Sequence, residues 1–142
     1  MENSESPFYS MTLTSFVSYP DDVWLTNAPG FSRYNAFMFD RVDPLTAKTR
    51  LENGAVLIDV REQAEFDQVR VPGATLIPLS EFATRFTEMP KDQEVVLMCA
   101  GGVRSAQAAQ FAAQHGFKLT NLEGGISAWH AEGLPVEFGG AS

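Results

Sequence analysis

The single cysteine of the chain opens a short loop whose composition suits anion binding. In order, the residues are Cys99, Ala100, Gly101, Gly102, Val103 and Arg104. Glycines let such a loop curl until successive backbone N–H groups point inward, and the positive end of a following helix strengthens this nest. Because a thiolate is an anion, we expect the pKa of Cys99 to fall below the free-thiol value of ~8.5. The pattern predicts a cysteine nucleophile at neutral pH.

Cys99 and Arg104 each have a structural interpretation as well. A lone cysteine is often just a small buried apolar residue. A structural thiol, however, needs no glycines or arginine after it, whereas a reactive thiol needs an electropositive setting. Arg104 could point into solvent, but a cation in the first turn of a helix opposes the helix dipole and therefore favours a nearby anion. We predict that both residues act in catalysis.

The elements that would position these residues alternate along the chain from residue 43 onward. We expect strands at 55–60, 74–77, 94–98 and 118–122, and helices at 44–51, 62–69, 80–88, 104–115 and 125–131. Asp43 and Ser80 are the expected N-caps of the first and third helices. This alternation predicts an α/β fold with a central, mostly parallel sheet and helices on both faces.

The carboxyl ends of the parallel strands are the expected position of the site. Right-handed crossovers bring these ends to one edge of the sheet, so Asp59, Arg61 and Cys99 should converge there. We interpret Asp59 and Arg61 as supporting residues that pair with each other or cap the next helix. His115 and His130 lie near helix ends, and two isolated histidines with one cysteine predict no metal site.

Four separated parts of the chain resemble the rhodanese family, over about residues 43–136. These are Leu57-Ile58-Asp59-Val60-Arg61-Glu62, then Glu65-Phe66 with Pro72-Gly73-Ala74, then Cys99 to Arg104, then Leu122-Glu123-Gly124-Gly125-Ile126-Ser127-Ala128-Trp129. The resemblance implies a sulfurtransferase that needs no cofactor. Cys99 would take the outer sulfur of a donor such as thiosulfate and pass it from a persulfide to cyanide or a thiol. Arg104 would hold the anionic donor, and the N–H groups of residues 100–104 would cradle the persulfide.

The chain departs from the family pattern at two places. Val69, Arg70 and Val71 stand where the family usually has Gly-His-Ile before its proline. Ala100 stands where thiosulfate-preferring relatives often carry a second arginine. The resemblance thus indicates the type of reaction and leaves the sulfur donor open.

Two other functions compete with sulfur transfer. Cysteine phosphatases and arsenate reductases also curl a loop around a thiolate, but they place five residues between cysteine and arginine. Here four residues separate Cys99 from Arg104, and Ser105 occupies the position that would have to be arginine. The shorter loop suits one sulfur atom better than a phosphate. A non-catalytic rhodanese-like binding or sulfur-relay module is the other alternative, and loss of the cysteine usually marks it.

Composition restricts the partners. The chain of 142 residues has 10 basic and 18 acidic residues, and its net charge of −8 repels a phosphate backbone, so we expect no nucleic acid. Its apolar runs are too short to span a bilayer. One cysteine cannot form an internal disulfide, and Glu2 and Glu5 stand where a secretory signal would be basic. We expect a cytoplasmic protein.

The N-terminal region differs from the rest of the chain. Residues 1–38 lack a regular periodicity, yet the chain up to Phe39 holds nine of its sixteen aromatic residues. That is too apolar for a solvated tail. We predict an irregular arm that packs on the catalytic domain, residues 39–142, or on a partner subunit, in which case the chain forms a homodimer.

Overall fold

The computed structural model describes residues 39–139, and the unit discussed below comprises residues 40–112 and 116–139. The predicted N-terminal arm lies outside the described residues. The strands are β2 (Asp40–Val42), β3 (Val56–Asp59), β4 (Val69–Arg70), β5 (Thr75–Leu76), β6 (Glu94–Met98), β7 (Lys118–Leu122) and β8 (Glu137–Phe138). The helices are α1 (Pro44–Glu52), α2 (Gln63–Gln68), α3 (Leu79–Arg85), the 3₁₀ helix η1 (Phe86–Glu88), α4 (Val103–Ala113) and α5 (Gly125–Ala131).

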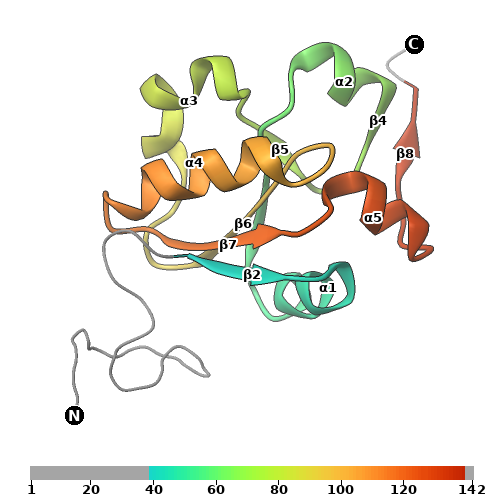
Figure 1. Cartoon of the computed structure of the whole chain (residues 1–142), viewed down its shortest axis with the longest axis horizontal. Helices are drawn as coiled ribbons and strands as arrows, with labels where there is room; N and C mark the ends of the chain where they lie inside the picture. Colours follow the sequence, from blue (N-terminus) through green and yellow to red (C-terminus); the bar gives the residue numbers. More distant parts are fainter. Residues whose placement is uncertain (1–38, 140–142) are drawn as a thin grey trace. The chain divides into compact units, whose positions relative to one another are not determined.

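A parallel sheet forms the centre of the fold. Among the described residues, five strands make this sheet in the order β2-β7-β6-β3-β5, and every neighbouring pair runs parallel. β4 and β8 form a separate antiparallel pair. Helices α3 and α4 lie on one face of the sheet and α1 lies on the other, with α5 packed beside α1 (Figure 1). The predicted α/β fold class is confirmed.

The strand β6 shows why the sheet is buried on both sides. Four of its five residues, Val95 to Met98, are fully buried. Val96 and Met98 join the apolar core on the side of α1 and α5, while alternation turns Val95 and Leu97 to the other face. The core on the α1 side consists of Val42, Ala47, Leu57, Val71, Val96, Met98, Leu122, Ile126 and Trp129.

The face covered by α3 and α4 is held together by aromatic contacts. Phe111 on α4 meets Phe86 edge-on with ring centroids 5.1 Å apart and meets Phe82 at 6.2 Å. Edge-to-face pairs at such distances are favourable beyond the area that they bury. They fix α4 against α3 and η1, and α4 is the helix that follows the Cys99 loop.

Of the two predicted N-caps, one is confirmed and the other is wrong. Asp43 does cap α1, since its carboxylate accepts the N–H of Thr46 at 2.8 Å. Ser80 is not an N-cap: α3 begins at Leu79 after Pro78, and the Ser80 hydroxyl donates to Glu62 at 2.8 Å instead. The Leu79 N–H donates to the Val60 carbonyl at 2.9 Å, which ties the start of α3 to the end of β3.

Other predicted elements differ in length. The predicted helix at 80–88 divides into α3 and η1, and α4 begins one residue earlier and ends two residues earlier than expected. The strands β2, β4 and β8 were not predicted. They are only two or three residues long, which is too short to show an alternating pattern.

Strand register aligns the ends that form the site. Asp59 pairs with Met98 between β3 and β6, and Leu97 pairs with Asn121 between β6 and β7. Just beyond the strands, the Val60 N–H donates to the Met98 carbonyl at 2.9 Å. The carboxyl ends of the three strands therefore lie along one edge, as the sequence predicts.

Candidate active site

Cys99 lies immediately beyond β6, and the residue is 1% exposed. Its Sγ accepts the N–H of Gly102 at 3.1 Å and the hydroxyl of Ser105 at 3.5 Å. The loop thus curls back so that its own backbone, together with the first turns of α4, contacts the sulfur. This is the nest predicted from the glycines, with Ser105 as an additional donor.

The environment of Cys99 favours its thiolate. Burial raises the pKa of the thiol, but hydrogen bonds from the Ser105 hydroxyl and from the N–H groups of Ser105, Gly102 and Gly101 outweigh burial, and the pKa falls below its ordinary value. Donors that bind the charged form of an acid lower its pKa in this way. The predicted direction of the shift is confirmed.

The carbonyl groups of the loop are bound on the side of β7 and α5. The carbonyl oxygen of Cys99 accepts the Ile126 N–H at 2.9 Å, and that of Ala100 accepts the Ser127 N–H at 3.2 Å. The carbonyl oxygen of Gly102 accepts the side-chain amide of Asn121 at 3.1 Å. With these three carbonyl groups bound on the side away from the sulfur, the N–H groups of Gly101, Gly102 and Ser105 are directed toward Cys99 Sγ.

Two glycines are required by this close packing. Gly102 has a φ of +101°, and a Cβ there would lie 3.0 Å from the Gly124 nitrogen. Gly125 has a φ of +61°, and a Cβ there would lie 2.3 Å from the Cys99 carbonyl oxygen. A larger residue at either position would push the loop away from α5.

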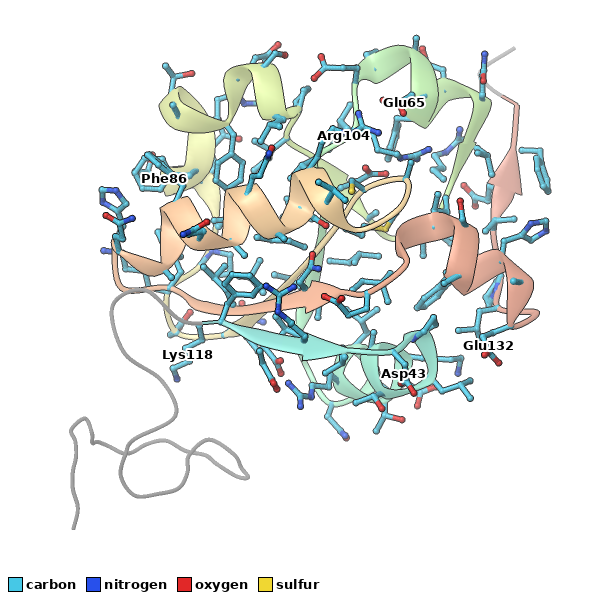
Figure 2. All side chains as sticks on the ribbon, in the orientation of Figure 1. Asp43, Glu65, Phe86, Arg104, Lys118 and Glu132 are labelled. Atoms are coloured by element: carbon cyan, nitrogen blue, oxygen red, sulfur yellow. The ribbon has the colours of Figure 1, made fainter. Side chains whose placement is uncertain are left out.

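Arg104, the last residue of the loop, is bound to an acidic residue. Its Nη1 and Nη2 each donate to one carboxylate oxygen of Glu65 at 2.9 Å. Figure 2 shows the two side chains, from α4 and α2, pointing toward one another. Arg104 lowers the pKa of Glu65 to about 2, against the opposing effect of burial. Glu65 in turn raises the pKa of Arg104, and the charges of Cys99 and Asp59 add to this effect.

Asp59 and Arg61 form a buried ion pair close to the loop. Arg61 Nη2 and Nε donate to the Asp59 carboxylate at 2.8 and 3.1 Å, and the two side chains are 0% and 3% exposed. Arg61 also donates to the main-chain oxygens of Val69 at 2.6 Å and Glu65 at 3.4 Å. The pair therefore connects the end of β3 to α2 and to Val69, the residue that follows this helix. That Asp59 and Arg61 pair with each other is confirmed.

The segment that replaces Gly-His-Ile has a structural position. Arg70 donates to the main-chain oxygens of Phe66 at 3.3 Å and Gly139 at 2.9 Å, and it forms an ion pair with Glu137 at 3.3 Å. Val69 and Arg70 form β4, which pairs with β8. Arg70 therefore attaches the C-terminal strand to α2.

Three residues at the site were missed from the sequence: Ser105, Glu65 and Asn121. Ser105 follows the loop directly, and its place in the first turn of the helix after the loop was a usable signal. Glu65 lies 39 residues from Arg104, and its partner could be inferred only from the fold. Asn121 gave no signal, because an asparagine in a buried strand predicts no particular contact.

The described residues contain neither a metal-binding cluster nor a membrane-spanning helix. Residues 39–139 hold no cluster of three or more histidine, cysteine, aspartate or glutamate side chains suited to a metal ion. No helix in the same range has the length and apolar character needed to cross a membrane.

The parallel sheet and the curled cysteine loop together define a rhodanese-like fold and site. The sequence matches the family model described as Rhodanese-like domain over residues 43–132, and the chain belongs to this family. It is 37% identical over 102 residues to a sulfurtransferase of Allochromatium vinosum, covering 70% of this chain and 95% of that protein. It is 30% identical over 103 residues to the thiosulfate sulfurtransferase GlpE of Glaesserella parasuis, covering 71% and 95%.

A solved structure supports the same family membership. The crystal structure of a rhodanese-related protein from Thermoplasma volcanium superposes with a TM-score of 0.67 at 29% identity, covering 70% of this chain and 98% of that chain. The expected membership of the rhodanese-like family is confirmed.

Proposed function

We propose that this chain is a sulfurtransferase that carries sulfane sulfur as a persulfide on Cys99. The observation that carries the proposal is the Gly102 N–H, which lies 3.1 Å from a sulfur whose pKa is lowered. A thiolate held by backbone donors is a nucleophile at neutral pH. Support also comes from the relatives, which include proteins named sulfurtransferase and thiosulfate sulfurtransferase.

The proposed reaction has two steps. With thiosulfate as donor, the Cys99 thiolate attacks the outer sulfur, a new S–S bond forms, and the S–S bond to sulfite breaks with its electron pair leaving on sulfite. In the second step cyanide or a thiolate attacks the outer sulfur of the persulfide, and the Cys99 thiolate is regenerated. Every electron pair is accounted for by donor and acceptor, so no cofactor is needed.

The loop donors have a role in each step. The negative charge lies on Cys99 Sγ before attack and on the outer persulfide sulfur afterwards. The N–H groups of Gly101, Gly102 and Ser105 and the Ser105 hydroxyl stabilise the thiolate. We propose that Ala100, Val103 and the rest of the loop close around the outer sulfur, and that Arg104 attracts an anionic donor.

Thiocyanate formation from thiosulfate and cyanide tests the proposed function. The wild-type protein should turn over, and Cys99→Ser should fold with the same thermal transition yet form no thiocyanate. Turnover by Cys99→Ser would contradict the persulfide route. A wild-type protein that accepts no sulfur from thiosulfate or from an organic donor would favour a non-catalytic binding module.

A further inference from the structure

The positive charge of Arg104, at the end of the loop, is neutralised by an adjacent carboxylate. Arg104 uses both terminal nitrogens to bind the two oxygens of Glu65, each at 2.9 Å. Neither side chain is deeply buried, since Arg104 is 34% and Glu65 37% exposed. An incoming anion therefore meets a pair whose charges sum to zero rather than a lone guanidinium.

Glu65 is held in place independently of Arg104. Its Oε1 also accepts the backbone N–H of Glu62 at 3.0 Å, which closes a capping box at the start of α2. Its main-chain oxygen accepts Arg61 Nη1 at 3.4 Å. Because these contacts do not involve Arg104, they hold Glu65 beside the loop on their own. With a pKa of about 2, Glu65 is ionised at neutral pH.

Among the residues that the structure describes, the charged side chains that act on Arg104 and Glu65 add no net positive charge. Asp59 and Arg61 cancel each other in their buried pair. Glu62, whose carboxylate accepts the Ser80 hydroxyl, adds a second negative charge to the first turn of α2. Ala100 supplies no cation within the loop. A donor with two negative charges is repelled more strongly here than a donor with one.

We propose that Glu65 is a specificity-determining residue: by neutralising Arg104 it makes the site favour sulfur donors with a single negative charge, such as thiosulfonates and organic persulfides, over dianionic thiosulfate. The inference rests on the proposed sulfur transfer at Cys99. With an alkanethiosulfonate the Cys99 thiolate attacks the terminal sulfur, the S–S bond forms, and the bond to the sulfonyl sulfur breaks with its electron pair leaving on a sulfinate. The two donor classes thus share one reaction and differ in charge.

The test compares thiosulfate with methanethiosulfonate in the wild type and in Glu65→Gln. Glutamine retains an oxygen that can accept from Arg104 Nη1 and from the Glu62 N–H, but it removes the negative charge and the second acceptor for Arg104. The ratio of kcat/KM for thiosulfate to kcat/KM for methanethiosulfonate should rise about threefold to tenfold at low ionic strength, and the rise should shrink as salt is added. Any change in thiolate reactivity or loop stability affects both donors and cancels in the ratio.

Two further variants separate charge from position. Glu65→Asp keeps the charge and alters the reach of the side chain, so its ratio should stay near the wild-type value. Glu52→Gln removes a charge from the exposed Lys48 pair on α1, on the opposite face of the sheet from α4, and should leave the ratio unchanged. An unchanged ratio in Glu65→Gln, or an equal rise in Glu65→Asp or Glu52→Gln, would overturn the inference.

The proposed function and this inference can fail separately. Intact mass measurement should show a gain of one sulfur atom on the wild type with at least one of the two donors. Absence of that gain with both donors overturns sulfur transfer itself. If both donors give the gain but the ratio of their kcat/KM values is the same in the wild type and in Glu65→Gln, only the role of Glu65 in donor choice is overturned.

Discussion

Asn121 and Gly102 are joined across the site by a hydrogen bond of 3.1 Å from the asparagine side-chain amide to the glycine carbonyl. The N–H of the same glycine donates to Cys99 Sγ at 3.1 Å. Asn121 is completely buried in β7, where its amide also reaches Glu123. A rigid strand thus fixes the residue whose N–H binds the reactive sulfur, and the sheet contributes directly to the orientation of the loop.

Replacement of Asn121 by leucine should weaken both the fold and the thiolate. The buried Gly102 carbonyl would lose its partner, so the free energy of unfolding should fall by about 1–3 kcal/mol in chemical denaturation. The pH profile of the Cys99 alkylation rate should also shift to higher pH, because a less well oriented Gly102 N–H stabilises the thiolate less. Gln93→Ala is the matched control, since its amide donates to the Gly54 carbonyl at 3.1 Å at an exposed site. An alkylation profile unchanged in Asn121→Leu would separate Asn121 from the sulfur.

Ser105→Ala tests the hydroxyl donor. The Ser105 side chain is foremost among the groups that lower the pKa of Cys99, so its removal should raise that pKa and slow alkylation at neutral pH. The fold should lose at most about 1.5 kcal/mol, the usual net value of one hydrogen bond. Ser127→Ala, at an exposed position on α5, provides the comparison. Equal alkylation rates for Ser105→Ala and wild type would show that the hydroxyl does not act on the sulfur.

The Glu65 and Arg104 pair predicts a specific pH dependence of stability. The pKa of Glu65 is lowered from its ordinary value of 4.5 to about 2 in the folded protein. A lowered pKa in the folded state contributes stability above the unfolded value, and this contribution is lost as pH falls from about 4.5 to about 2. The stability difference between wild type and Glu65→Gln should therefore be constant above pH ~5 and decrease below it. A difference that is independent of pH would assign the effect to packing.

Arg104→Ala should impair the reaction with thiosulfate more than the fold. Without Arg104 the Glu65 carboxylate is left without its charge-assisted partner and repels the anionic donor, so kcat/KM with thiosulfate should fall by a factor equivalent to on the order of 1.5 to 3 kcal/mol. Arg104→Lys keeps the charge but not the two-pronged contact with Glu65, and it should recover part of the loss. Thiosulfate kinetics left intact in Arg104→Ala would assign the arginine to structure alone.

The sequence was sufficient for features that arise from local patterning. The strand predicted at 94–98 coincides with β6, and the nest followed from two glycines between a strand and a helix. The meeting of Asp59, Arg61 and the Cys99 strand followed from the handedness of parallel crossovers. These are properties that short segments or general topology determine.

Contacts between residues far apart in the chain could not be predicted from the sequence. Glu65 meets Arg104 across 39 residues, and Asn121 meets Gly102 across 19. Such partners depend on side-chain direction after folding, which periodicity does not reveal. Ser80 was misplaced as a cap because Pro78, with its extended backbone, already sets the start of α3, and the hydroxyl then binds Glu62.

The role of Cys99 as sulfur carrier is tested most directly by the intact mass of the wild type and of Cys99→Ser after incubation with thiosulfate and removal of excess donor. The wild type should gain the mass of one sulfur atom, lose it again on addition of cyanide, and release thiocyanate in equal amount. Cys99→Ser should show no gain. A wild type that stays unmodified, or a Cys99→Ser variant that gains sulfur, would contradict the proposal that Cys99 is the sulfur carrier.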